Sequence, residues 1–193
     1  MLTTSESELL SHYLERGGEP WNVSLEAAWL DYELRAWIRP RLPGGWPVAV
    51  CNIGIGVGLF DDWLGHELGA VITSVDRDPQ ICRTFAARQR RERHPFPARV
   101  RCGDACDGML GTSRFDAITI VGSTLAETGD RAELERAALA ALVPGGTLLV
   151  AEVGNKEPPP GLELRWLGEM WIGFRADVKR VAERAAVEQS SAS

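Results

Sequence analysis

A run of alternating glycines is the first feature of this sequence that could support chemistry. In the segment CNIGIGVGLF, residues 51–60, Gly54, Gly56 and Gly58 follow an apolar, β-rich run. Glycine adopts backbone conformations that other residues avoid and lets main-chain amides approach a ligand closely. The spacing differs from the dinucleotide fingerprint G-x-G-x-x-G because Leu59 fills the third small position, and no Gly-Lys-Ser/Thr follows to form a P-loop. The run therefore indicates either another nucleotide-like ligand or a tight strand-to-helix turn.

Two aspartates occupy the ends of later apolar runs. Asp76 ends the segment AVITSVD, and Asp104 ends the segment ARVRCGD. A carboxylate at the end of a second strand can accept hydrogen bonds from ribose hydroxyls. Asp104 can accept a hydrogen bond from an adenine amino group, and the amide of Ala105 can donate to a ring nitrogen. Asp76 could instead cap a helix or close a turn, which is the commoner role of an isolated aspartate after a strand.

The elements that must position these residues alternate along the chain. Five apolar, β-rich runs predict strands, at 47–53, 70–76, 98–104, 115–123 and 144–153. Helical patterns fall between or before them, at 5–16, 24–40, 58–68, 78–93 and 131–143. Residues 162–169 and 170–183 predict a closing hairpin. Strands alternating with helices build a parallel sheet, and ligands bind at the carboxyl ends of its strands.

Taken in order, five segments resemble the class I S-adenosylmethionine-dependent methyltransferases. They are VAVCNIGIGVG, SVDRDP, GDA, FDAITIVGS and LVPGGTLLVAE, and the resemblance spans about residues 46–181. It implies an α/β, Rossmann-like, seven-stranded and mostly parallel sheet with an antiparallel last strand, helices on both faces and an N-terminal helical cap. We accordingly expect a cap at 1–40, a cofactor-binding domain at 41–185 and a disordered tail at 186–193.

The resemblance also implies S-adenosyl-L-methionine as the cofactor and in-line methyl transfer as the reaction. The residues that would bind the cofactor match the family's motifs and are Asn52, Gly54, Ile55, Gly56, Gly58, Asp76, Arg77, Asp104, Ala105, Val121, Gly122 and Ser123. The family usually has an acidic residue where this chain has Asn52. Asp61 and Asp62, just past the glycines, are candidates to supply the missing charge.

The acceptor is less well defined by the sequence. Nucleic-acid amino methyltransferases of this family often carry an acidic or polar residue, then Pro-Pro and an aromatic residue, after the fourth strand. This chain lacks that motif after its predicted fourth strand, which favours a small-molecule acceptor. An aromatic acceptor could stack on rings such as Trp21, Tyr32 or Trp171, although core packing explains most tryptophans equally well. No catalytic residue can be assigned. The candidates for a general base are His12, Asp31, Glu127 and Glu152.

Charge and composition limit the kinds of partner and the location that we expect for this protein. The net charge of −6 makes nucleic acid an unexpected partner, and the basic stretch 88–94 is predicted to be a solvated helix face. No apolar run is long enough to span a membrane, so we expect a cytoplasmic protein. Four scattered cysteines predict buried thiols and no metal site. The sequence leaves open whether the chain forms a homo-oligomer.

Three alternative functions remain open as well. The same sulfonium could donate an aminopropyl or aminocarboxypropyl arm in place of a methyl group. The chain could also be a non-catalytic binding subunit that keeps the methyltransferase fold. A nicotinamide oxidoreductase is disfavoured by Leu59.

Overall fold

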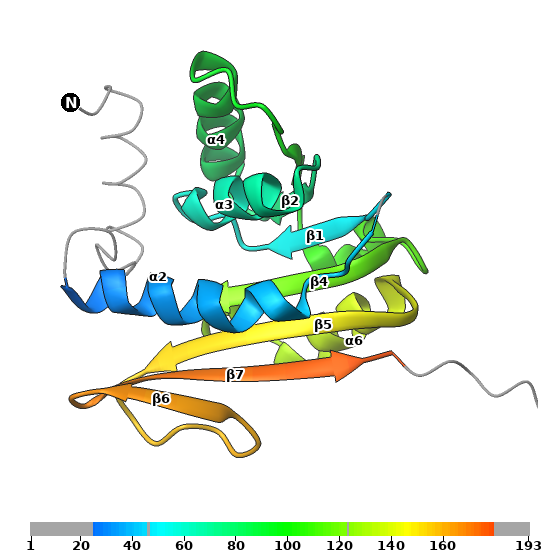
Figure 1. Ribbon diagram of the computed structural model, residues 1–193. Helices are drawn as coiled ribbons and strands as arrows, with labels where there is room; N and C mark the ends of the chain where they lie inside the picture. The colour runs from blue at the N-terminus through cyan, green and yellow to red at the C-terminus, as the bar shows by residue number, and fades with distance from the viewer. Residues whose placement is uncertain (1–24, 46, 123, 180–193) are drawn as a thin grey trace, which may run out of the picture.

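A single seven-stranded sheet organises the computed structural model, which describes residues 25–45, 47–122 and 124–179. Its strands are β1 (Val50–Ile53), β2 (Thr73–Asp76), β3 (Arg99–Cys102), β4 (Phe115–Gly122), β5 (Leu142–Gly154), β6 (Glu163–Leu167) and β7 (Met170–Val178). They lie in the order β3-β2-β1-β4-β5-β7-β6 (Figure 1). β1 to β5 pair in parallel, whereas β7 is antiparallel to both β5 and β6. The predicted mostly parallel sheet with an antiparallel last strand is confirmed.

Helices cover both faces of this sheet. They are α2 (Leu25–Ile38), η1 (Arg39–Arg41), α3 (Leu59–Leu68), α4 (Pro79–Arg91), η2 (Ala105–Met109), α5 (Thr124–Glu127) and α6 (Arg131–Ala141). Neighbouring residues of a strand point to opposite faces. Accordingly Ala151 packs in one core with Leu30 of α2 and Leu64 of α3, whereas Val150 packs in the other core with Leu134 of α6. In Figure 1, α2 and α6 lie on opposite sides of β5.

Helix α2 is part of the main core rather than a separate layer. The ring of Trp37 stacks on Phe174 of β7 with centroids 4.8 Å apart, and its Nε1 donates to Glu163 Oε2 of β6 at 2.8 Å. These contacts join the first described helix to the last two strands. The rest of the predicted cap, residues 1–24, and the predicted tail, 186–193, lie outside the described residues.

The start of β5 differs from the sequence prediction. We expected a helix to residue 143 and a strand from residue 144, but α6 ends at Ala141 and β5 begins at Leu142. The register between β4 and β5 shifts between Phe115 and Ala117. This irregularity lets the segment LVPGG join the sheet, because a bulge absorbs extra residues that regular pairing cannot accommodate.

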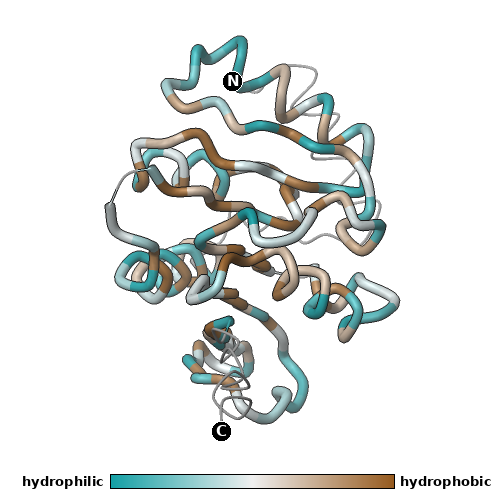
Figure 2. The backbone as a smooth tube through the Cα atoms, turned by 90° about the vertical axis from the view of Figure 1, so that its right-hand side faces the viewer, coloured by the Kyte–Doolittle hydropathy of each residue, from teal (hydrophilic) through white to brown (hydrophobic). Residues whose placement is uncertain are grey.

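The hydrophobic segments lie in the strands through the centre of the molecule, and the outer helical turns are hydrophilic (Figure 2). Among the described helices, none combines the length and the apolar character that crossing a membrane requires.

Candidate functional site

A cavity of about 470 Å³ opens at the carboxyl ends of the parallel strands. This volume is within the usual range for small-molecule sites, roughly 300–1,000 Å³. The cavity lies at the switch point between β1 and β4, where the order of successive strands reverses, which is where α/β sheets bind ligands. Most of the predicted cofactor residues line it: Gly54, Ile55, Gly56, Gly58, Asp76, Arg77, Asp104, Ala105, Val121 and Gly122.

The three glycines after β1 have left-handed backbone conformations, with φ of 89° at Gly54, 54° at Gly56 and 77° at Gly58. Protein neighbours, as well as any ligand, exclude side chains there. A Cβ on Gly54 would lie 2.1 Å from Thr124 Oγ1, and one on Gly58 would lie 2.4 Å from the ring of Phe85. Glycine is therefore required to bring the loop against α5 and α4 simultaneously.

Asp76 joins the end of β2 to the glycine loop. Its Oδ2 accepts a hydrogen bond from the amide of Ile55 at 2.9 Å, and its Oδ1 accepts one from the amide of Asp78 at 2.8 Å. The helix-capping role that the sequence also allowed belongs instead to Asp78, whose side chain accepts from the amides of Gln80 and Ile81. The half-buried Asp76 carboxylate is thus held in place at the cavity wall.

Arg77 and Asp104, both predicted to contact the adenine, line the cavity. Arg77 is exposed, and its Nη2 donates to the carbonyl of Glu127 at 3.1 Å, which connects two parts of the cavity wall. Asp104 Oδ1 accepts from the amide of Cys106 at 2.8 Å and caps η2. Ala105 is buried beside it. Ser123, predicted at the end of β4, lies outside the described residues, but its neighbours Gly122 and Thr124 line the cavity.

Asn52 is the predicted cofactor residue that lies behind the cavity wall rather than on it. Its side chain is fully buried, and protein groups satisfy it. The Nδ2 donates to the carbonyl of Gly54 at 2.9 Å and to Asp61 Oδ1 at 3.0 Å, and the Oδ1 accepts from Thr119 Oγ1 at 2.8 Å. Asn52 therefore contacts the glycine loop from within the core.

The basic stretch 88–94 includes a residue that the sequence analysis missed. The predicted solvated face is wrong for Arg88 and Gln89, whose exposed fractions are 8% and 2%. Arg88 Nη1 donates to the carbonyl of Val57 at 2.7 Å, Nη2 donates to that of Gly58 at 3.3 Å, and the guanidinium pairs with Asp62. The charge run contained a buried anchor for the glycine loop. The signal that could have revealed it is that Arg88 follows Ile81 and Phe85 at helical spacing.

The cavity wall on the β5–β7 side, away from Asp76 and Asp104, is apolar. It comes from α2, from the start of α3 and from the ends of β5 and β7, and consists of Ala27, Leu30, Leu34, Phe60, Ala151, Val153 and Ile172, with Asp31 as its charged member. Phe60 is the one aromatic ring that the described residues contribute to the cavity. The predicted aromatic platform is therefore not seen in this part of the chain.

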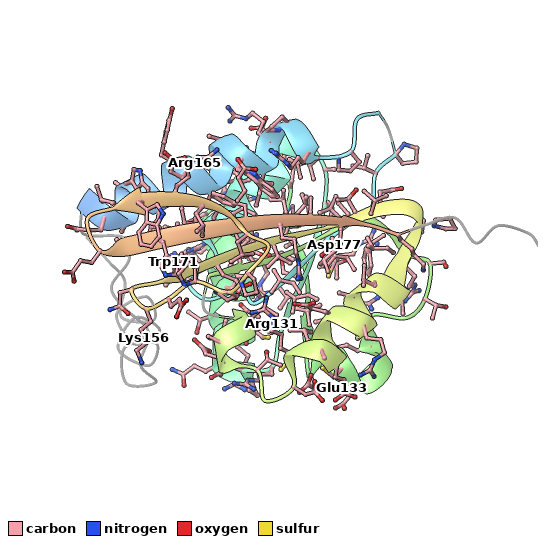
Figure 3. The ribbon with its side chains drawn as sticks, turned by 90° about the horizontal axis from the view of Figure 1, so that it is seen from below. Arg131, Glu133, Lys156, Arg165, Trp171 and Asp177 are labelled. Carbon is pink, nitrogen blue, oxygen red and sulfur yellow. The ribbon has the colours of Figure 1, made fainter. Side chains whose placement is uncertain are left out.

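The two predicted acceptor-binding residues that the structure describes, Tyr32 and Trp171, do not lie at this wall. Tyr32 is 69% exposed and does not line the cavity. Trp171 is buried on the α6 side of the hairpin, where its Nε1 donates to the carbonyl of Lys156 at 2.5 Å, whereas Arg165 lies on the α2 side (Figure 3). The next residue, Ile172, faces the cavity instead. Trp21 lies outside the described residues.

The candidates for a general base that the structure describes lie in different places. Asp31 and Glu127 line the cavity, and Asp31 pairs with Arg35 at 2.8 Å. Glu152 does not line it, and both of its carboxylate oxygens accept hydrogen bonds from Arg131, at 2.7 and 2.5 Å. His12 lies outside the described residues. Of the three candidates that the structure describes, Asp31 alone belongs to the apolar wall.

The cysteines are free thiols that differ in burial. Cys51 and Cys82 are buried as predicted, Cys106 is half-buried and Cys102 is exposed. Burial raises the pKa of Cys82 to about 12, so this thiol stays protonated beneath Asp76, to whose carbonyl it donates at 3.4 Å. The described residues contain no group of three side chains able to hold a metal ion.

Residues 50–146 match the model of a family described as a methyltransferase domain. No curated protein sequence matches the chain. Similar solved structures include that of the [4+2]-cyclase SpnF, with 23% identity, 82% of this chain and 60% of that chain covered and a TM-score of 0.61. Geranyl diphosphate methyltransferase in complex with GPP and sinefungin gives 16% identity, 67% and 47% coverage and a TM-score of 0.58.

A third similar structure is that of Haemonchus contortus phosphoethanolamine N-methyltransferase 2 in complex with S-adenosyl-L-methionine. It gives 20% identity, 80% coverage of this chain, 34% of that chain and a TM-score of 0.58. The present chain spans less than two thirds of the length of each of these three proteins.

Proposed function

The chain belongs to the methyltransferase domain family, and from this membership we propose that it transfers a methyl group from S-adenosyl-L-methionine to a small-molecule acceptor. The observation that carries the proposal is the continuity of one cavity. Asp76, the glycine loop and Asp104 form one side of it, and the apolar wall that includes Leu30 and Ile172 forms the other.

The hydrogen-bonding capacity of the Asp76 carboxylate fits the ribose of the cofactor. An ionised carboxylate offers about four lone-pair positions. The amides of Ile55 and Asp78 occupy two of them, which leaves acceptor capacity for two ribose hydroxyls. Asp104 and the Ala105 amide would hold the adenine edge, and the amides of the glycine loop would lie against the methionine part.

The charge of the cavity also fits a cationic ligand. Its described lining has eight carboxylates and one cationic side chain, Arg77. The carboxylates are Asp31, Asp76, Asp78, Asp104, Asp107, Glu127, Asp130 and Glu133. A site lined predominantly by one sign of charge favours ligands of the opposite sign. This arrangement supports binding of a sulfonium compound and opposes an acceptor that carries a phosphate or carboxylate.

When bound, S-adenosyl-L-methionine supplies an electrophilic methyl group, which the acceptor attacks in line as the carbon–sulfur bond breaks. The contribution of the chain is alignment and exclusion of water. Val121 and Gly122, at the end of β4, lie between the loop side and the apolar wall of the cavity lining. Leu30, Leu34 and Ile172 would bury the apolar body of the acceptor, and Asp31 can hold a cationic group or receive a proton.

A second reaction class needs a test because the [4+2]-cyclase SpnF has a similar fold. The fold alone therefore does not determine the chemistry. Transfer of an aminopropyl or aminocarboxypropyl arm is a further possibility, and so is a purely binding role. The lining residues are compatible with each of these functions, so identification of the reaction product must distinguish between them.

Calorimetry with S-adenosylmethionine and S-adenosylhomocysteine, followed by turnover assays, tests the proposal. The acceptor panel should contain neutral, cationic and anionic members of matched apolar size, and mass spectrometry should identify each product. We expect binding of both cofactor forms and a gain of one methyl group on neutral or cationic acceptors. Absence of cofactor binding would contradict the proposal. A larger transferred group would favour transfer of the longer arm, and binding without turnover would favour the binding role.

A further inference from the structure

Asp61, in the first turn of α3, is a fully buried carboxyl group that the proposed reaction does not use. Its exposed fraction is 1%. Its Oδ1 accepts hydrogen bonds from Ser74 Oγ at 2.5 Å and from Asn52 Nδ2 at 3.0 Å. Its Oδ2 has no hydrogen-bond partner among the described residues. A buried carboxyl group with an unsatisfied oxygen costs free energy, so its presence indicates a role other than stability.

Asp61 reaches the glycine loop through Asn52. The same Nδ2 that donates to Asp61 also donates to the carbonyl of Gly54 at 2.9 Å. Thr119 Oγ1 donates to Asn52 Oδ1 and so fixes the orientation of the amide. One side chain therefore joins a carboxyl group in the core to the first residue of the loop that lines the cavity.

The surroundings of Asp61 allow its charge to vary near neutral pH. Burial is the main cause that raises its pKa to about 7, with a smaller contribution from Asp62, while the hydrogen bonds from Ser74 and Asn52 oppose the increase. The thiol of Cys51 on β1 interacts electrostatically with Asp61, and burial raises the pKa of this thiol above its usual range. Thr119 on β4 donates to Asn52 rather than to Asp61. Arg88, the nearby cation, pairs with Asp62 instead.

We propose that Asp61 is a positioning residue, which sets the glycine loop through Asn52 and supplies a buried negative charge that favours the cationic cofactor over its neutral product. This inference rests on the proposed function. S-adenosylmethionine carries a sulfonium charge that S-adenosylhomocysteine lacks. A charge in the core is screened less than one at the surface, so the two ligands should differ in their response to Asp61.

Linkage gives the sign of the effect. A cation that binds near Asp61 favours its ionised form, and ionised Asp61 therefore favours the cation by the same factor. S-adenosylmethionine should bind more tightly as pH rises through the titration of Asp61. S-adenosylhomocysteine, whose sulfur is neutral, should respond less.

The test compares dissociation constants of both ligands for wild type and Asp61→Asn between pH 6 and pH 8. The Asn side chain keeps the shape and the acceptor for Asn52 but cannot ionise. Titration of the ligands themselves is common to both proteins and cancels in the ratio of their dissociation constants. If binding of S-adenosylmethionine lowers the pKa of Asp61 by one unit, the ratio of the wild-type and variant dissociation constants for this ligand changes about fivefold between pH 6 and pH 8. Glu67→Gln, which removes a charge from the partly exposed side of the same helix, should leave the ratio constant.

Ser74→Ala provides a second, independent readout. It removes a hydrogen bond that lowers the pKa of Asp61, so the midpoint of the pH dependence should move to higher pH. A merely structural role would not move that midpoint. A ratio for Asp61→Asn that stays constant with pH, or an equal change for both ligands, would overturn the inference. If wild type binds neither ligand at any pH, the proposed function fails first and this inference fails with it.

Discussion

The carboxylate of Asp76 accepts a hydrogen bond from the amide of Ile55 at 2.9 Å, so the end of β2 and the glycine loop form one hydrogen-bonded unit. The two residues are far apart in sequence, and both line the cavity. The group proposed to bind the ribose therefore also holds the loop that would contact the rest of the cofactor. Changes at Asp76 should affect both functions together.

Replacing Asp76 tests this coupling most directly. Asp76→Ala removes a charged acceptor, and hydrogen bonds to charged groups contribute roughly 1.5–3 kcal/mol each. We expect the dissociation constant for S-adenosylhomocysteine to rise by at least about tenfold, measured by calorimetry. Glu157→Ala removes the same charge from an exposed loop and serves as the control. An unchanged affinity in Asp76→Ala would contradict the assigned cofactor position.

Gly54 tests whether the loop conformation depends on contact with α5. Gly54→Ala combines a strained left-handed φ with a Cβ that would lie 2.1 Å from Thr124 Oγ1. The free energy of unfolding should fall by about 2–4 kcal/mol, and cofactor affinity should fall with it. Adding Thr124→Ala should restore the part due to the clash, while the strain in φ remains.

Gly44→Ala is the matched control for that experiment, because a Cβ there meets nothing within 4 Å and φ is not left-handed. Its stability, measured by urea denaturation, should stay within about 1 kcal/mol of wild type. If both substitutions lowered stability equally, contact with Thr124 would not be what excludes a side chain at residue 54.

Arg88 should behave as a structural anchor rather than as a surface charge. Arg88→Ala leaves the carbonyls of Val57 and Gly58 and the carboxylate of Asp62 without their shared donor. Removing one partner of a buried ion pair costs roughly 3–5 kcal/mol of stability. Arg90→Ala, on the exposed side of the same helix, should change stability by less than about 0.5 kcal/mol. Thermal denaturation of both variants checks this difference, and similar melting temperatures would disprove it.

Trp171 should contribute to stability and not to ligand binding. Trp171→Phe loses the hydrogen bond to the carbonyl of Lys156 and part of the packing against Gly154. We expect the free energy of unfolding to fall by about 1–3 kcal/mol with cofactor affinity and turnover of an identified acceptor unchanged. Ile172→Ala, one residue further, should instead alter acceptor turnover. The opposite pattern would restore Trp171 as an acceptor-binding residue.

Asp61 should make the fold less stable at neutral pH than in acid. Its pKa is about 7 in the folded protein, whereas the ordinary pKa of an aspartate, which applies in the unfolded chain, is 3.8. The stabilising contribution is therefore complete below pH 3.8 and is lost as pH rises to about 7. Asp61→Asn should be more stable than wild type at pH 8 by up to about 4 kcal/mol, and the difference should shrink toward pH 4. Urea denaturation at both pH values measures it, and a difference independent of pH would refute the assignment.

Local pattern was sufficient to predict the main strands and helices and the place of the candidate site. Alternating strands and helices implied a parallel sheet, and the carboxyl ends of its strands gathered Gly54, Asp76 and Asp104 around one cavity, as expected from strand direction alone. The closing hairpin was also predictable, because its two apolar runs are separated by a short polar turn.

Side-chain direction was less predictable. Trp171 and Ile172 are adjacent, and which of them faces the cavity depends on the register of β7 against β5. The charge run at 88–94 could not reveal that Arg88 turns inward, because its partners Val57, Gly58 and Asp62 come from a distant segment.

By itself, the sequence determined an alternating α/β chain with a glycine-rich loop after its first strand, because periodicity and glycine content are local properties. Only the tertiary structure decided that Asn52 is directed into the core and meets Asp61 and Thr119 there. Burial and hydrogen bonding between segments distant in sequence arise from packing, and they decide where a charge lies and whether it ionises.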